Sequence, residues 1–305
     1  MLDAERLVVF RSVAAHGSIA AAARELGYTR SAISQQMSAL ERTAGAALLI
    51  RGGNSITITP LGRRLLEHTE RILIELRAAE ATLHQDRTEI TGTLRVGVAF
   101  REGPPIMSSA LTQIRLKYPQ LELTLAAVRD DQGADDVRHG RLDVAIQSSF
   151  GSRPPVEELG LKQWVLGSDE LVLAVPATHP LAERPSCAIA ELTEEAWVVC
   201  QSNPLGQTTL RLCAEASYRP HIVASVNDVA TALDLVRVGW GITVAPQFTP
   251  ATGSPDAVRR IPLEGVTARR HSMLLVRAGD EELPEIAAVV AAVHQAAQST
   301  PLGTP

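Results

Sequence analysis

The sequence has little lysine, few aromatic residues and few cysteines, and it holds no long apolar run. Lys117 and Lys162 are its two lysines, so arginine supplies nearly all of the positive charge. Its three cysteines are an odd number, which does not suit a disulfide framework. No stretch approaches the roughly 20 apolar residues of a membrane helix, and the N-terminus lacks a charged-then-apolar signal region. We therefore expect a cytoplasmic protein that does not enter the membrane.

Sequence signatures of catalysis are missing as well. The chain has no nucleophile elbow, no paired-histidine metal spacing and no Gly-rich phosphate loop. Its histidines are scattered, among them His139, His179, His221 and His271. Since isolated histidines are usually structural or solvated, we expect no enzyme activity, no bound metal and no cofactor.

Residues 18–42 have the pattern of two short helices joined by a tight turn. Gly27 suits the left-handed residue that ends the first helix, and Thr29 can cap the second. In the second helix Ala32, Ile33, Met37 and Leu40 recur at helical spacing and can pack inward. The opposite face carries hydroxyls, an amide and arginine, groups that bind base edges and phosphates. The predicted DNA contacts on it are Thr29, Arg30, Ser31, Ser34, Gln35 and Ser38.

The next segment predicts a two-stranded wing. Two strand-like runs flank the turn signal Gly52-Gly53-Asn54. Gly53 and Asn54 at its tip would allow a close approach to phosphate, and Arg51 at its base is a phosphate or minor-groove candidate. Taken alone, residues 18–42 could also be a helical hairpin with a solvated polar face. The predicted wing, taken alone, could be a plain surface hairpin.

A long helix is expected to follow. Thr59 fits its N-cap and Pro60 its first position. A seam at alternating spacings of four and three, flanked by charged residues, is typical of a short coiled coil and predicts a homodimer or homotetramer. The alternative is a single amphipathic helix that packs on its own domain. The seam consists of Leu65, Thr69, Ile72, Leu76, Ala79 and Leu83.

Charge is distributed unevenly along the chain. Residues 1–66 carry eight arginines against four acidic residues, a net charge of +4, whereas the whole chain carries −5. The remainder therefore carries −9. A basic N-terminal part followed by an acidic remainder favours a nucleic-acid partner for the N-terminal part.

From residue 92 the pattern alternates between strands and helices, which predicts a parallel α/β organisation. Strands are expected at 94–99, 121–127, 142–147, 170–176, 197–200, 222–225 and 242–246, with late strands at 259–262 and 272–276. Helices are expected at 107–118, 135–140, 208–217, 228–238 and 284–298.

The whole order resembles the LysR-type transcriptional regulators. Specific stretches are Phe10 to Gly17, Ala21 to Leu26, Ala32 to Glu41, Thr59 with Gly62, Tyr118-Pro119, Gly140 to Ile146 and Gly239 to Ile242. The resemblance implies an α/β fold class: a winged helix-turn-helix (1–59), a linker and dimerisation helix (60–89) and a two-lobed, periplasmic-binding-protein-like effector domain (92–302). Lobe I would hold about 92–163 and 268–300, and lobe II about 164–267. The late strands would return to lobe I, with crossovers near 162–167 and 265–269.

An effector site is expected where strands end, because ligands of open α/β sheets bind beyond their carboxyl ends. The resemblance places the inducer pocket between the lobes at matching positions. A small polar or anionic effector suits these residues, although Ser202, Asn203 and Asn227 could instead only cap helices. The candidates are Phe100, Arg101, Gln147, Gln201, Ser202, Asn203 and Asn227.

The expected partners are double-stranded operator DNA, the small effector and a second copy of the chain, with RNA polymerase as a further candidate. Two alternatives remain open. One is a thiol-based redox regulator of the same family, for which Cys200 and Cys213 are the candidates. The other is a solute-binding receptor, which would share the two-lobed body.

Overall fold

The computed structural model describes residues 1–52, 55–84, 90–99, 104–129, 132–152, 160–201, 203–249 and 255–299. It consists of two compact units. Unit 1 holds Met1–Arg87 together with Arg277–Pro284, and unit 2 holds Thr88–Val276 and Glu285–Pro305. Within the described ranges, none of the helices combines the length and the apolar character needed to cross a bilayer.

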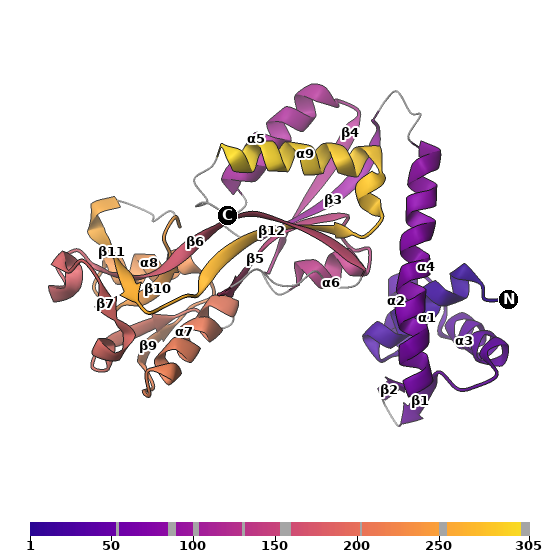
Figure 1. Ribbon diagram of the computed structural model, residues 1–305, viewed down its shortest axis with the longest axis horizontal. Coiled ribbons are helices and arrows are strands. Elements are labelled where there is room, and N and C mark those ends of the chain that lie inside the picture. The colour runs from indigo at the N-terminus through magenta and orange to yellow at the C-terminus, as the bar shows by residue number, and fades with distance from the viewer. Residues whose placement is uncertain are drawn as a thin grey trace. The chain divides into compact units, whose positions relative to one another are not determined.

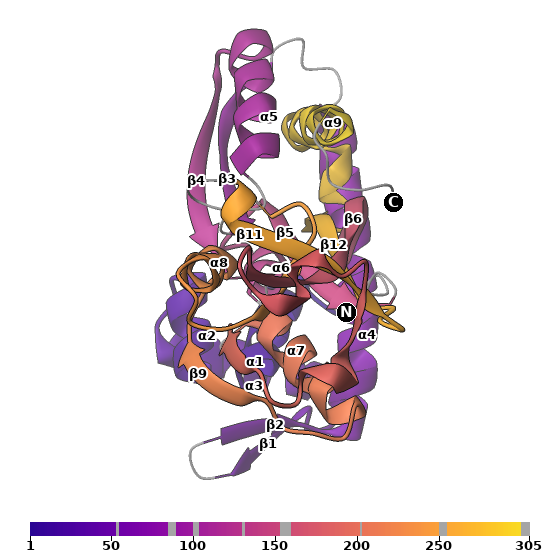
Figure 2. The ribbon, with the colours of Figure 1, turned by 90° about the vertical axis from the view of Figure 1, so that its left-hand side faces the viewer.

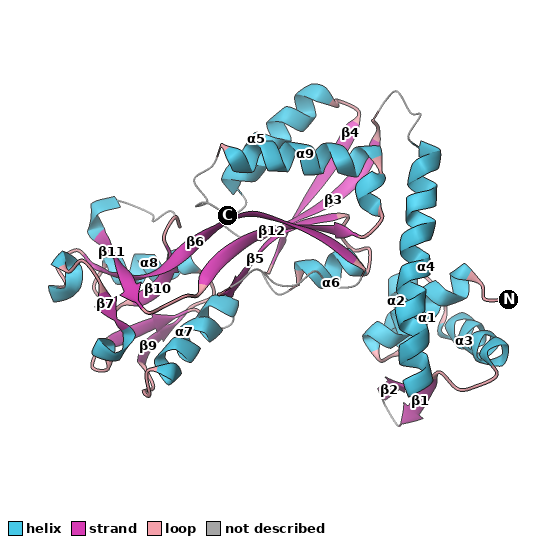
Figure 3. Cartoon of the chain, viewed as in Figure 1, coloured by secondary structure: helices cyan, strands magenta, loops and turns pink. Residues whose placement is uncertain are grey.

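Unit 1 is a helical domain with a two-stranded wing (Figures 1 and 3). Both sides of the predicted turn are capped as expected. Gly27 adopts a left-handed φ of 69°, and the Thr29 side chain accepts a hydrogen bond from the Ala32 N–H at 3.2 Å. Its elements are α1 (Ala4–His16), α2 (Ile19–Leu26), α3 (Arg30–Ala44), β1 (Leu49–Gly52), β2 (Ser55–Ile58) and α4 (Pro60–His84).

The long helix α4 begins at Pro60, as predicted. The Thr59 hydroxyl accepts from the Gly62 N–H at 2.9 Å and donates to the Ala47 carbonyl at 3.1 Å. Gly62 is required because a Cβ there would collide with the Leu48 carbonyl oxygen. The predicted seam is wrong at Thr69, which is fully buried inside unit 1.

Unit 2 is built on an eight-stranded sheet in the order β4-β3-β5-β12-β6-β11-β7, with β10 also paired to β6, and on a small sheet of β8 with β9. The strands are β3 (Gly92–Ala99), β4 (Leu121–Val128), β5 (Val144–Gly151), β6 (Leu161–Pro176), β7 (Cys187–Ala188), β8 (Ala196–Val199), β9 (His221–Ser225), β10 (Thr243–Pro246), β11 (Val258–Glu264) and β12 (Arg269–Arg277). The helices are α5 (Pro104–Lys117), α6 (Gly133–Arg138), α7 (Pro204–Glu215), α8 (Val229–Arg237) and α9 (Pro284–Gln298).

One lobe of unit 2 contains β3, β4, β5 and β12. The strand β3 runs parallel to both β4 and β5, which confirms the predicted parallel organisation, and β12 is antiparallel to β5. The helices α5 and α9 lie on the same side of this part of the sheet (Figures 1 and 2). Asp143 joins β3 to β5: its carboxylate accepts from the Arg95 backbone N–H at 2.8 Å and from the Arg95 guanidinium at 3.0 and 3.1 Å.

The other lobe surrounds β8, β10 and β11, and its core is centred on the fully buried Trp197 with Leu173 and Leu205. The chain passes from one lobe to the other within β6, a single strand that pairs with strands of both lobes and contains the crossover expected at 162–167. One expectation about the connection is wrong. Of the late strands, only β12 returns to the first lobe, because β11 pairs with β6 and β7.

Candidate functional site

The recognition helix α3 has one face anchored in the protein and one face open. Ile33, Met37 and Leu40 are at most 1 % exposed and fix the inner face. On the opposite side Thr29, Arg30, Ser31, Gln35 and Ser38 are exposed and Ser34 is half-buried. The structure therefore brings the helical residues of the predicted DNA-contact set onto one accessible surface.

This surface contains a shallow depression of about 380 Å³, lined by Ser34, Gln35, Ser38 and Arg42. Arg42 was not among the predicted contact residues, although its four-residue spacing from Ser34 through Ser38 already indicated a place on the same helical face. The depression thus combines two hydroxyls, one amide and one guanidinium.

The four acidic residues of the first 66 all have hydrogen-bond donors inside the domain. Asp3 accepts from the Glu5 N–H at 2.9 Å, and Glu5 accepts from the Tyr28 hydroxyl at 2.8 Å. Glu25 accepts from the Ser12 hydroxyl, and Glu41 accepts from the Leu48 and Leu49 N–H groups at 2.9 and 3.2 Å. The carboxylates are thereby directed to internal partners, so the open face of α3 keeps the charge of its arginines.

Two contacts hold the wing on the domain. Glu41 links the end of α3 to the start of β1, and the Ile56 N–H of β2 donates to the Gly17 carbonyl at the end of α1 at 2.9 Å. Arg51 lies in β1 opposite Ile56. The predicted tip residues Gly53 and Asn54 lie outside the described residues, as does the side chain of Arg51.

Of the predicted effector residues, Gln201, Asn203 and Asn227 are brought together. Asn203 caps α7 by accepting from the Gly206 N–H at 3.0 Å, and its amide nitrogen donates to the Asn227 carbonyl at 3.3 Å. Gln201 accepts from the Ser225 hydroxyl at 3.2 Å. Asn227 does not cap α8.

The neighbouring Asp228 is the N-cap of α8 instead, accepting from the Thr231 N–H at 2.9 Å. Because Asn203 caps the chain directly before Pro204, α7 begins four residues earlier than the expected 208. Gln147 also has a structural partner, since its side-chain oxygen accepts from the Ala134 N–H at 3.0 Å at the start of α6. Phe100, Arg101 and Ser202 lie outside the described residues.

Two further polar side chains lie where the lobes meet. Ser149 and His271 are register partners on β5 and β12, and α7 of the second lobe contacts β5. Within the described part of the chain, the buried Ser149 hydroxyl and His271 Nδ1 have no hydrogen-bond partner. The His271 Nε2–H donates to the Gly151 carbonyl at 3.1 Å, which leaves Nδ1 as an acceptor.

Burial lowers the pKa of His271. Its ring is therefore neutral at pH 7, and Nδ1 stays available to a donor. No pattern in the sequence singled out this pair, because the two residues are far apart along the chain.

The three cysteines are buried and none of them is in a disulfide. Burial raises the pKa of all three thiols, that of Cys200 to about 12. Because the thiolate is the reactive form, these residues are poor nucleophiles in the folded protein.

The comparisons with known proteins cover both units. Residues 4–63 match the family model "Bacterial regulatory helix-turn-helix protein, lysR family", and residues 87–298 match the "LysR substrate binding domain". The chain is 25 % identical over 262 residues to the transcriptional regulator AlsR of Bacillus subtilis, covering 85 % of each chain. It is 27 % identical over 245 residues to a probable hydrogen peroxide-inducible genes activator of Mycobacterium leprae, covering 79 % of this chain and 76 % of that one.

Among solved structures, a full-length variant of OxyR from Pseudomonas aeruginosa matches with a TM-score of 0.64 at 18 % identity, covering 99 % of this chain and 100 % of that one. This likeness concerns the fold. The two family models follow one another along nearly the whole chain. The first model covers the helical domain with the open face of α3, and the second covers the two lobes. The chain therefore belongs to the LysR family of DNA-binding transcriptional regulators, with an effector-binding domain after its helix-turn-helix.

Proposed function

We propose that this regulator acts in the cytoplasm, reads its operator with the open face of α3 and the wing, and responds to a small polar or anionic effector held between the lobes. The domain bounds 1–59, 60–89 and 92–302 are part of this proposal. The observation that carries it is the surface formed by Arg30, Gln35 and Arg42, which faces outward while the acidic side chains of residues 1–66 accept hydrogen bonds from other groups of the domain.

The chemistry of that surface suits a DNA groove. Arginines at both ends of the helix match phosphates or guanine, and the Gln35 amide can form a bidentate pair with adenine. Arg51, Gly53 and Asn54 of the wing would add contacts to the backbone. The small side chains of Ser31, Ser34 and Ser38 allow the helix to approach the base edges closely.

Gln35→Ala tests whether the face reads sequence. We expect it to cost on the order of 1–3 kcal/mol on the cognate site and much less on random DNA, because a base-edge contact is lost while phosphate contacts remain. Fluorescence anisotropy on a footprinted operator and on a scrambled duplex measures both. Gln36→Ala makes the same change one position along α3 and should leave both affinities nearly unchanged; equal losses on the two duplexes for Gln35→Ala would show that Gln35 reads no base.

A polar effector is supported by the groups at the junction of the lobes. The buried Ser149 hydroxyl and His271 Nδ1 offer a donor and an acceptor to a ligand, and the Gln201–Asn203–Asn227 group lies beside the start of α7. Arg101 and Phe100, which follow β3 directly, are proposed to complete the site and to favour an anion. The effector would act by binding two arrangements of the lobes unequally.

Self-association is proposed to use the exposed apolar residues of α4. Leu61, Ile72, Leu76 and Leu83 are 42, 37, 40 and 82 % exposed. With Ala79 they recur at spacings that place them along one stripe of the helix, which a second copy would cover. A homodimer or homotetramer would bind two half-sites, and RNA polymerase is proposed as a further partner at the promoter.

Thiol-based sensing is a second candidate, favoured by the similarity to the probable hydrogen peroxide-inducible genes activator of Mycobacterium leprae. The burial of the cysteines weighs against it. We expect iodoacetamide at pH 8 to label the native protein about tenfold or more slowly than the denatured chain, since the raised pKa values suppress the thiolates. Non-reducing mass spectrometry after peroxide should show reduced cysteines, and an internal Cys200–Cys213 disulfide would instead establish the thiol mechanism.

A further inference from the structure

The connection between β12 and α9 lies against α4, and by its contacts it belongs to unit 1. We call this segment, Arg277–Pro284, the strap. It includes the short helix η4 (Asp280–Glu282). At its centre Gly279 has a φ of +92°, and a Cβ there would lie 2.7 Å from the Ile74 carbonyl oxygen of α4. The absence of a side chain therefore lets the strap approach the helix backbone directly.

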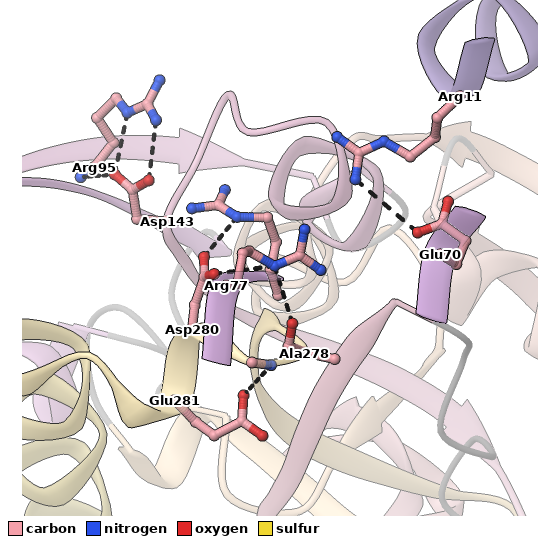
Figure 4. A network of polar contacts seen from close by, with 10 residues as sticks. Arg11, Glu70, Arg77, Arg95, Asp143, Ala278, Asp280 and Glu281 are labelled. Carbon is pink, nitrogen blue, oxygen red and sulfur yellow. Dashed lines mark hydrogen bonds and ion pairs between the residues drawn. The ribbon is translucent and has the colours of Figure 1, made fainter. Parts of the chain in front are cut away.

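A buried carboxylate fastens the strap. Asp280 is 2 % exposed, and each of its oxygens has a guanidinium partner. The Arg77 Nε of α4 lies 3.2 Å from Oδ1, and the Arg277 Nε lies 2.6 Å from Oδ2. Arg77 Nε also donates to the Ala278 carbonyl at 3.0 Å, while the Gly279 N–H donates to Glu281 at 2.6 Å (Figure 4).

Loss of one cationic partner would leave the buried Asp280 carboxylate strongly destabilised. We therefore expect the strap to be either docked or fully released into water. Burial lowers the pKa of Arg77, and the charge of Asp280 acts against this. Since arginine is not deprotonated in proteins, the Arg77 guanidinium remains charged while the strap is docked.

The same helix carries the contact onward to the DNA-binding face. Arg11 of α1 lies 4.0 Å from Glu70 of α4 (Figure 4). The helix α1 shares one core with α3, since Phe10 packs in the same cluster as Ile33 and Met37. A shift of α4 at Arg77 would therefore also move α1, the helix that supports α3.

We propose that the strap is a latch on the linker helix, through which the strand β12 and the helix α9 of the effector-binding unit are coupled to the DNA-binding helices. The inference rests on the proposed function for its physiological meaning, because it gives the effector response a path through Arg77 and Asp280. The docking itself is independent of that function.

Hydrogen–deuterium exchange on the full-length protein tests the docking. In Asp280→Asn and Arg77→Met, amide exchange of the strap should rise by on the order of tenfold or more, because the docked state loses its buried ion pair. Glu282→Gln removes one charge from an exposed residue of the same strap, and Arg71→Met removes one from an exposed position of α4. Both controls should leave strap exchange unchanged.

Gly279→Ala provides a second test that keeps every charge. Its Cβ would meet the backbone of α4, whereas the control Gly265→Ala has a similar left-handed φ of +72° with no atom within 4 Å of the added Cβ. Faster strap exchange in Gly279→Ala and not in Gly265→Ala is expected. If Asp280→Asn, Arg77→Met and Gly279→Ala all exchange like the wild type, the strap is not fastened and the proposal is overturned.

Operator DNA tests the coupling. Because linkage is reciprocal, a duplex from the protein's own footprint should slow exchange in β12 and α9 of the wild type, and this change should vanish in Asp280→Asn. The same slowing in both proteins, or none in the wild type, would refute coupling through the strap. If no duplex binds the wild type, the proposed function fails, and the exchange of the strap without DNA still decides whether it is docked.

Discussion

Replacing Leu76 with aspartate is expected to break the assembly of this regulator and to weaken operator binding by roughly 10²–10⁴-fold, the gain that linking two binding modules provides. Leu76 is 40 % exposed in the single chain and lies at the middle of the apolar stripe of α4. In a dimer it would be covered, and a carboxylate there would be buried without a partner. Sedimentation velocity should show a smaller species.

Thr82→Asp is the matched control, because it adds the same carboxylate to an exposed position of the same helix away from the stripe. It should assemble and bind its operator like the wild type. Circular dichroism of both variants separates loss of assembly from loss of folding. A Leu76→Asp protein of unchanged size and affinity would place Leu76 outside every interface and remove α4 as the dimerisation helix.

A second large effect is expected in unit 2, where Asp169→Ala should lower the free energy of unfolding by about 3–5 kcal/mol. The side chains of Asp169 and Arg270 are 0 and 4 % exposed and form a bidentate ion pair at 2.8 and 3.0 Å between β6 and β12. Asp169 also accepts from the Phe248 N–H at 3.0 Å. The substitution removes the carboxylate to which both the buried Arg270 guanidinium and the Phe248 N–H donate.

The neighbouring Glu170 provides the control. Its side chain is 67 % exposed, and it pairs with Arg269 at 3.2 Å. Because surface ion pairs contribute roughly 0–1 kcal/mol, Glu170→Ala should unfold almost like the wild type. Urea unfolding followed by tryptophan fluorescence measures both. Equal stabilities of the two variants would mean that the buried pair contributes no more than the exposed one.

The local features of this protein were determined by its sequence. Cap and turn residues act over three or four positions, so Gly27, Thr29 and Pro60 were sufficient to predict where helices end and begin. The inner face of α3 followed from the spacing of Ile33, Met37 and Leu40, and that spacing left the polar residues outside. The family could be inferred for the same reason, since its most specific motifs are short.

Tertiary structure decided which distant residues meet. Nothing local distinguishes Asp169, which is buried against Arg270, from the exposed Glu170 beside it. Thr69 looked like a seam residue because periodicity gives the face of a helix but not the surface that the face meets. The same limit hid the continuity of β6, the pairing of β11, and the contact of Arg77 with Asp280. Burial and charge pairing between distant segments depend on the assembled sheet and helices, so they arise only once the chain has folded.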